Sequence, residues 1–349
     1  MQNTDFRLPG KVRTPLTAAQ RLATGIPHRV TRLRGPFSAL LSRVHEIGMV
    51  TIMSGNESAI QERVGIYDHA AYQNHSESYA ESHTESRAES YADPVSSKGA
   101  QQVLFYQKWK YGFAVLEKDG DGNIQRHLQF FDGNGNGIHK ILLHPSSNVD
   151  AYRAIVREFA AADQAPVLDI FRTRPMTANE GVARIDIDAL RADWAHLNNT
   201  EDFFARLTEF DHLRLHKLRL AGKAFAHQVA NDSARILLQK MAELGSTVMT
   251  LVGNAGIVQA YQGRIKQIRS SDVWLTITSP DHRLRLREDH IDTVWVAKKP
   301  TTDGIVTSLE LFNRQGLSIA RFFSKPEPGR PEPREWRDSI MRLLPVFGA

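Results

Sequence analysis

The stretch that decides the fold runs from Asp292 to Phe323 and has the sequence DTVWVAKKPTTDGIVTSLELFNRQGLSIARFF. Apolar and polar residues alternate along it, and glycine-containing turns separate the alternating runs. Alternation with a period of two, broken by such turns, is typical of an antiparallel β-meander. The chain contains a second copy from Lys108 to Leu143, KWKYGFAVLEKDGDGNIQRHLQFFDGNGNGIHKILL. Two such copies predict a duplicated domain.

Equivalent residues of the two copies stand at one constant offset along the chain. The first set is Leu128, Phe130, Phe131, Asp132, Gly135, Ile138 and Lys140, and the second is Leu309, Leu311, Phe312, Asn313, Gly316, Ile319 and Arg321. Each copy is also predicted to begin with a strand that carries a tryptophan, Trp109 or Trp295. An ordered series of matches of this kind indicates duplication rather than chance.

A second constant offset relates the GlyAsn pairs Gly55-Asn56 and Gly253-Asn254. Before each pair, an apolar stripe at helical spacing ends at a glycine, and another such stripe follows each meander. The predicted unit is therefore helix, strand, GlyAsn turn, strands, meander and helix. The predicted fold class is α+β, a tandem duplication in which each half is a large antiparallel sheet flanked by helices.

The predicted organisation has four segments. Residues 1–36 form a basic arm, 37–165 a first repeat, 166–186 a linker and 187–349 a second repeat. The arm holds seven arginines and lysines against one aspartate, 7 − 1 = +6, while the whole chain has a net charge of +5. We interpret it as an irregular arm packed on the first repeat, with a targeting peptide or a polyanion contact as alternatives.

Residues 74–99 interrupt the first repeat with the tandem tetrapeptide ESYA, ESHT, ESRA, ESYA. In a helix, Glu77, Glu81, Glu85 and Glu89 would stack on one face and repel one another, with no apolar residues to bury. A disordered acidic loop is the better interpretation.

Composition excludes several classes of site. The chain has no cysteine, which rules out disulfides and thiolate chemistry. No run approaches the roughly 18 apolar residues of a membrane span, so membrane insertion is not expected. The GlyAsnGlyAsnGly run at 133–137 lies between predicted strands and indicates a hairpin turn rather than a phosphate loop. The basic arm has a single aromatic residue, Phe6, which does not favour nucleic-acid binding.

Two helices are predicted after the linker, the first over residues 188–197 and the second after Thr200, a natural N-cap. Glu201 then stands in the first turn, where the helix dipole favours an acid. The following HLRLHKLRLAG alternates charged and apolar residues, which predicts a strand with Arg214 and His216 on one face.

These residues carry a resemblance to a known family. GNESAIQERVGIY, NTEDFFARL and LREDHIDTVWVAKKPTTDGIVTSLELF are similar to segments of the bacterial hemin-degrading factor, or HemS-type, family of heme-trafficking proteins, over nearly the whole chain from about residue 40. The resemblance implies tandem α+β halves, heme on the second half near the cleft, and cytoplasmic receipt of heme after import. A heme importer and a downstream heme acceptor are the implied partners, and heme degradation is an open question.

The resemblance also assigns site residues. It places the family's iron-ligating histidine at Glu201, and its basic residues for the heme propionates at Arg214 and Lys299. A carboxylate is a poor heme ligand beside imidazole, so nearby histidines are candidate substitutes. These candidates are His196, His212 and His216.

Two hypotheses follow from this changed site. In the first, the chain is a heme carrier whose axial ligand has moved or is missing. In the second, it is a non-heme paralogue that binds another planar anionic ligand. Retained Arg214 and Lys299 favour heme, because a cationic clamp needs an anionic ligand. Glu201 favours the alternative, as do Val103, Ala320 and Pro326 at positions where the family has other heme-contact residues.

Deletion of residues 74–99 is expected to leave the melting temperature and ligand affinity nearly unchanged, because the cost of closing a loop depends weakly on its length. Thermal unfolding followed by circular dichroism measures the first quantity, and ligand titration the second. A variant with the repeat replaced by a Gly/Ser segment of equal length is the control. A clear fall in melting temperature on deletion, but not on replacement, would show that the loop length matters; a fall in both would show that the acidic repeat docks.

Overall fold

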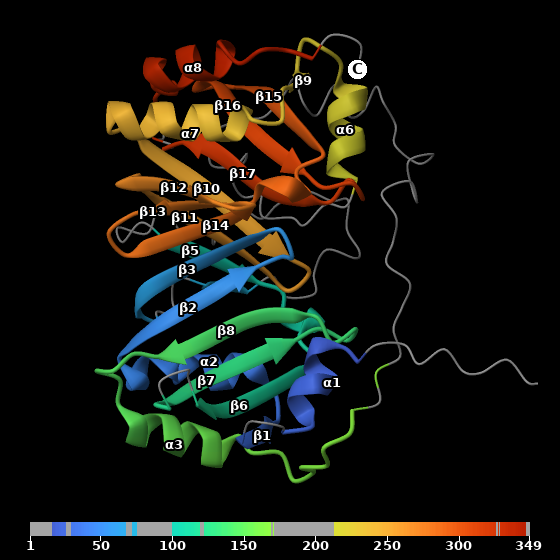
Figure 1. The fold of residues 1–349 in the computed structure, drawn as a ribbon, viewed down its shortest axis with the longest axis vertical. Coiled ribbons are helices and arrows are strands. Elements are labelled where there is room, and N and C mark those ends of the chain that lie inside the picture. Colours follow the sequence, from blue (N-terminus) through green and yellow to red (C-terminus); the bar gives the residue numbers. More distant parts are fainter. Residues whose placement is uncertain are drawn as a thin grey trace, which may run out of the picture.

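Two large β-sheets, stacked across the middle of the molecule, form the architecture of the computed structural model (Figure 1). The structure describes residues 16–25, 29–67, 72–74, 100–118, 122–168, 170, 213–325, 327 and 329–346. Helices α7 (Ser233–Leu244) and α8 (Arg334–Met341) lie together at one end, and α2 (Phe37–Ser42) and α3 (Val149–Glu158) at the other. The predicted α+β class with large antiparallel sheets and flanking helices is confirmed.

The first sheet has nine strands in the order β1-β6-β7-β8-β2-β3-β14-β13-β12. Its strands are β1 (Arg29–Leu33), β2 (Met49–Gly55), β3 (Ala59–Ile66), β6 (Tyr111–Lys118), β7 (Ile124–Phe131), β8 (Gly137–Leu143), β12 (Gln267–Ser271), β13 (Trp274–Thr278) and β14 (His282–Arg287). All neighbours in this sheet pair antiparallel.

The second sheet has eight strands in the order β4-β5-β11-β10-β17-β16-β15-β9. Its strands are β4 (Tyr72–Asn74), β5 (Ala100–Leu104), β9 (Ala226–Val229), β10 (Thr247–Asn254), β11 (Ile257–Arg264), β15 (Thr293–Thr301), β16 (Gly304–Phe312) and β17 (Ser318–Ser324). Only the short edge pair β4-β5 is parallel.

The duplication is visible in the strand order. β1-β6-β7-β8-β2-β3 of the first half repeats as β9-β15-β16-β17-β10-β11 of the second. Even an irregularity repeats, because the register shifts between Phe130 and Phe131 in one meander and between Leu311 and Phe312 in the other. The tandem repeat predicted from the two sequence offsets is therefore confirmed.

Each half also lends strands to the sheet of the other. β14, β13 and β12 continue the first sheet beyond β3, and β5 and β4 continue the second beyond β11. As a result, both apolar cores contain residues of both halves: Ala59 of β3 belongs to the core under α7 and α8, and Ile257 of β11 belongs to the core under α2 and α3. The two halves therefore cannot separate without opening both cores.

Two asparagines form hydrogen bonds between the halves at the centre of the molecule. The Asn56 side-chain amide donates hydrogen bonds to the carbonyls of Gly253 and Ile319, both at 3.0 Å. Asn254 reciprocates with hydrogen bonds to the carbonyls of Gly55 at 2.8 Å and Ile138 at 2.9 Å. Each asparagine oxygen also accepts two backbone N–H groups of its own turn. The pairs Gly55-Asn56 and Gly253-Asn254 thus make a symmetric set of hydrogen bonds between the halves, which we call the clasp.

Both glycines of the clasp are needed for close approach. A Cβ atom on Gly55 would lie 2.2 Å from the carbonyl oxygen of Ala59, and one on Gly253 would lie 2.9 Å from the carbonyl oxygen of Ile257. Since backbone atoms cannot move aside cheaply, only glycine fits before each asparagine.

Several expectations need correction. Trp109 does not lie in a strand: it follows the 3-10 turn η3 (Tyr106–Lys108) and precedes β6. Its indole is buried and donates a hydrogen bond to the carbonyl of Gly256, in the other half, at 2.8 Å. The helix expected to end at Gly48 is divided into α2 and a 3-10 turn, η1 (Val44–Ile47). From residue 16 onward the arm is not irregular: α1 (Ala18–Ala23) packs on the first sheet, and β1 pairs with β6.

The acidic loop, apart from Asn74 at the end of β4, lies outside the described residues. So do most of the linker and the two helices predicted after it. These expectations stay predictions.

Substitution of Asn254 by alanine is expected to lower the free energy of unfolding by about 2–4 kcal/mol, because two carbonyls of the first half, those of Gly55 and Ile138, lose their donor from the second half. Urea denaturation measures the change. Asn136→Ala is the matched control: its amide donates only within its own exposed turn, to Asp132, and the expected change is within about 0.5 kcal/mol. Equal effects of the two substitutions would contradict the role of the clasp.

Candidate functional site

A buried carboxylate, Glu310, marks one face of the second sheet. Register places it in one row with Trp295 of β15 and Arg321 of β17. Its side chain is completely buried. This face is opposite the one that packs under α7 and α8, since neighbouring Leu309 and Leu311 belong to that core.

Arg214 reaches Glu310 from helix α6 (Arg214–Ala221). Its Nε and Nη2 atoms donate to the two carboxylate oxygens of Glu310 at 2.9 and 2.5 Å, a bidentate ion pair. Arg214 is itself only 7% exposed. The pair therefore joins α6 to the centre of the sheet.

The strand predicted for HLRLHKLRLAG was wrong, because the segment is this helix. Leu215, Leu218 and Ala221 recur at three-residue spacing and so share one helical face. They pack on the sheet against Trp295 and Phe312. The apolar residues of this segment fit both the two-residue period of a strand and one face of a helix, so the local pattern does not distinguish the two. The segment is a helix because that face packs on the sheet.

Arg321 and Ser308 complete what we call the Glu310 cluster, defined as Arg214, Ser308, Glu310 and Arg321. Arg321 Nε lies 3.8 Å from Glu310, and the Ser308 hydroxyl donates to it at 2.9 Å. Burial by itself would raise the pKa of Glu310, but the charge and hydrogen bonds of Arg214, aided by Arg321 and Ser308, lower the pKa to about 2. The cluster is thus a carboxylate between two guanidinium groups with a net charge of +1.

Apolar side chains adjoin the cluster on the same face. Register continues the row from Arg321 to Leu251, and the next row contains Phe323 and Met249. With Val258 and Val306 they form one buried group. Lys299 of β15 lies opposite Val306, on the same face again. We call this buried group of side chains the apolar surface of the sheet; each is at most 9% exposed, and cations lie on the same face. An apolar face with cations beside it suits a flat apolar ligand with anionic edges.

The predicted site residues are only partly brought together. Arg214 and Lys299 share this face. His216 follows Arg214 by two residues, about 200° around the helix, and so faces away from the sheet; partial burial and Arg219 lower its pKa. His196, Glu201 and His212 lie outside the described residues, and their assignment stays a prediction.

The changed family positions fall on two faces. Val103 pairs with Val258 on the face of the Glu310 cluster, and is 2% exposed. Ala320 instead lies in the core under α7 and α8, on the far side of the sheet. Pro326 lies outside the described residues.

The first half keeps a related cluster at the equivalent positions. Gln129, Lys140, His127 and Glu117 occupy the places of Glu310, Arg321, Ser308 and Lys299. Glu117 lies 3.6 Å from Lys140 and 3.5 Å from the ring of His127. Both halves therefore keep ionic residues on this face, but only the second half has an acid on its central strand.

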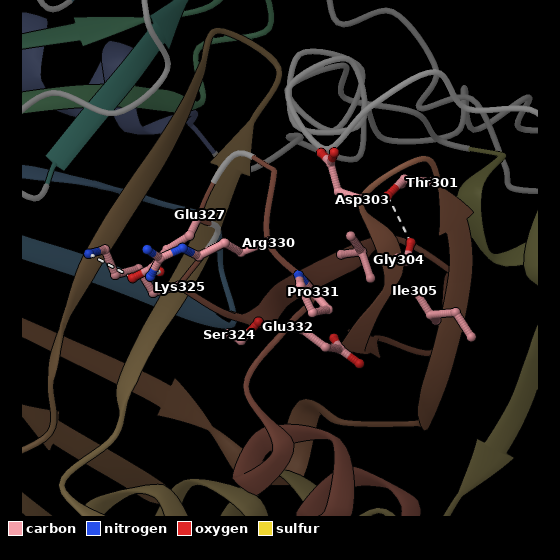
Figure 2. Close-up of a pocket in the computed structure, with 11 residues that line it drawn as sticks. Thr301, Asp303, Gly304, Ile305, Ser324, Lys325, Glu327, Arg330, Pro331 and Glu332 are labelled. Carbon is pink, nitrogen blue, oxygen red and sulfur yellow. Dashed lines mark hydrogen bonds and ion pairs between the residues drawn. The ribbon is translucent and has the colours of Figure 1, made fainter.

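A pocket also lies at the end of the β15-β16 hairpin, against the segment that follows β17 (Figure 2). Its charges are matched internally: Glu327 pairs with Lys325 at 3.5 Å and Arg330 at 3.3 Å. Glu332, whose pKa is raised by burial, accepts hydrogen bonds from Thr307 and Arg337. This pocket is a packing contact of the KPEPGRPE segment.

Within the ranges that the structure describes, no three His, Asp or Glu side chains gather so as to hold a metal ion. No described helix is long and apolar enough to cross a membrane.

A family model, the haemin-degrading HemS.ChuX domain, matches residues 16–159 and 212–343. The chain belongs to this family. The matched segments correspond to the two halves of the duplication, and the first includes the part of the basic arm that forms α1 and β1.

Individual members are similar over most of their length. The hemin transport protein HemS of Yersinia enterocolitica is 29% identical over 329 residues, which cover 94% of this chain and 90% of that protein. Among solved structures, holo-PhuS, a heme-binding protein from Pseudomonas aeruginosa, gives a TM-score of 0.78 at 31% identity, with 94% and 90% coverage. ChuS, an Escherichia coli heme oxygenase, gives 0.73 at 25% identity, with 93% and 92% coverage.

Sequence reasoning missed Glu310, Ser308 and Arg321 as site residues. A signal was present, because SLELF places an acid inside an otherwise apolar strand, and a charge in a buried strand needs a partner. The partner could not be named, since Arg214 lies 96 residues away and on a segment predicted as a strand.

Replacement of Arg214 by methionine is expected to lower the free energy of unfolding by about 3–5 kcal/mol at pH 7, because Glu310 would lose its main counter-charge. The folded pKa of Glu310, about 2, lies below its ordinary 4.5. Its contribution to stability is therefore present above about pH 4.5 and lost as the pH falls toward 2. The difference between wild type and variant should shrink over this window, as urea denaturation at pH 7 and pH 3.5 can measure.

Arg153→Met is the control for that experiment. Arg153 pairs with Asp150 at 3.0 Å, but their side chains are 60% and 88% exposed. The expected effect is small at either pH. If the loss of unfolding free energy caused by Arg214→Met were the same at pH 7 and pH 3.5, Glu310 would not be the ionised partner of Arg214.

Proposed function

We propose that this protein binds heme and carries it in the cytoplasm during heme and iron uptake. Membership of the HemS/ChuX family is the observation that carries the proposal. It is supported by similarity to a hemin transport protein and to a heme-binding protein over about nine-tenths of the chain.

The described residues fit heme in its apolar and anionic parts. The macrocycle is flat and apolar, and the surface formed by Met249, Leu251 and Phe323 offers it a matching face. Its propionates need cations, and Arg214 and Lys299 border that surface. Arg214 already binds Glu310, so a propionate would share this guanidinium with a protein carboxylate.

The candidate iron ligands stand in the second repeat, between residues 196 and 216. We propose Glu201 as the position that the family's histidine occupies, with His196 and His212 as substitutes for it. His216 is the least suited, because α6 turns it away from the Glu310 cluster. In this proposal the protein receives heme from an importer and passes it to an acceptor. Whether it also degrades heme depends on how the iron is held.

A second candidate function is a non-heme binding module for another planar anionic ligand. It is favoured by Glu201 at the ligand position and by Val103 at a contact position on the cluster face. Under this alternative the cations and the apolar surface remain in use, but no iron is held.

Titration with hemin, followed by visible absorption, is the test of the proposed function. A saturable Soret change at micromolar protein is expected. Lys299→Ala should weaken binding, because a charge-assisted contact with a propionate is lost, worth roughly 1.5–3 kcal/mol. Lys298→Ala is the matched control, since this neighbour on β15 faces the other side of the sheet. Absence of a saturable change in the wild type would reject the heme carrier.

The position of the ligand is tested in the same assay with Glu201→His. Neutral imidazole at this position should raise heme affinity and give the spectrum of a histidine-ligated form. His196→Ala, His212→Ala and His216→Ala then identify any substitute by loss of the Soret band. Hemin binding in the wild type that none of these variants alters would place the ligand elsewhere.

A further inference from the structure

Glu310 binds the guanidinium group of Arg214, which the ligand is also expected to bind. Arg214 gives both Nε and Nη2 to Glu310, at 2.9 and 2.5 Å, and the carboxylate is completely buried. A carboxylate held in this fork has the geometry and charge of a bound ligand carboxylate. Arg321 Nε, on the neighbouring strand β17, lies 3.8 Å from the same carboxylate. Glu310 is therefore an internal carboxylate in a site predicted to bind carboxylates.

The duplicated half shows that the sheet does not require an acid here. Gln129 stands at the position of Glu310 on β7, beside Lys140 at the position of Arg321. A neutral side chain is thus compatible with this strand geometry and with a neighbouring cation. The acid belongs only to the half in which Arg214 and Lys299 border the apolar surface.

We propose that Glu310 competes with the ligand's carboxylate for Arg214 and thereby sets the rate at which the ligand is released. This inference rests on the proposed function, the binding of heme through its propionates. A propionate at Arg214 would bring a second negative charge close to Glu310, and their repulsion in a partly dry site would weaken binding by about tenfold. A carrier gains from this arrangement, because a propionate held by unopposed arginines would dissociate slowly.

Ser308 moderates the competition. Its hydroxyl donates to Oε1 of Glu310 at 2.9 Å, the same oxygen that accepts from Nη2 of Arg214. Without that hydroxyl, the oxygen would have Arg214 as its main donor and would hold it more tightly. Glu310 and Ser308 are consequently positioning residues that act on the ligand through Arg214. Removing the charge of Glu310 and removing the hydroxyl of Ser308 are expected to change the release rate in opposite directions.

The test measures transfer of hemin from the loaded protein to an excess of apomyoglobin. Glu310→Gln is expected to slow release by about tenfold, because the competing charge is gone while the amide oxygen can still accept from Arg214. Ser308→Ala is expected to speed release by about two- to threefold. Gln129→Glu, the matched change in the first half, should leave the rate unaltered. Hemin dimethyl ester, which has no free propionate, should be released at one rate from wild type, Glu310→Gln and Ser308→Ala.

The outcomes separate this inference from the proposed function. If the wild type binds hemin and both variants release it at the wild-type rate, Glu310 has no part in release, although the carrier function stands. If the wild type does not bind hemin, both ideas fall. Equal changes with hemin and its dimethyl ester would show a general disturbance of the site and would overturn the proposal. Should Glu310→Gln fail to fold, as circular dichroism would show, Ser308→Ala keeps the same charge and decides by the direction of its effect.

Discussion

The exchange of strands between the two halves is the constraint on which the rest of the structure depends. An antiparallel sheet can be extended at its edge by any strand that offers a free row of N–H and C=O groups. Here β3 is extended by β14 and β11 by β5, so each edge is closed by the other half. The reciprocal hydrogen bonds of Asn56 and Asn254 fix where the two halves meet.

This constraint explains why the site lies where it does. One face of the second sheet is used by the core under α7 and α8, to which β14 and β13 contribute. The opposite face remains for α6 and the Glu310 cluster, with Trp295 and Phe312 beneath the helix. There β16 and β17 place Glu310 and Arg321 side by side in one row. The position of Arg214 then follows from the packing of Leu215 and Leu218, because a helical face that buries these leucines also points Arg214 at the sheet.

The two halves illustrate how a duplicated scaffold divides its roles. Both place ionic residues on the same face, but the charges are arranged differently: the acid is on β6 in the first half and on β16 in the second. In the first half α1 covers the face, with Phe113 and Phe131 beneath it. In the second half Arg214 and Arg321 meet at Glu310, and Lys299 lies on the same face of the sheet as the apolar surface. A single ancestral geometry thus accounts for two differently charged surfaces.

The sequence by itself determined the α+β class, the tandem repeat, the meanders and their turns, and the helices that precede and follow them, except that the helix expected before Gly48 is divided into α2 and η1. These follow from local periodicity and from two constant offsets, the second of which found Asn56 and Asn254. It also identified the family, and through the resemblance it predicts a role in ligand binding for Arg214 and Lys299. It did not assign HLRLHKLRLAG correctly, because its letters satisfy both a period of two and a helical face.

Only the tertiary structure decided how the halves interlock and which residues meet. Nothing in a strand's own sequence states that β14 pairs with β3, since any strand of suitable pattern can extend a free edge. Likewise Glu310 pairs with Arg214, 96 residues away along the chain, because helix α6 packs on the second sheet. Local patterns specify periodicity and therefore elements, whereas partners across a sheet or between a helix and a sheet are chosen by burial, which only the folded arrangement defines.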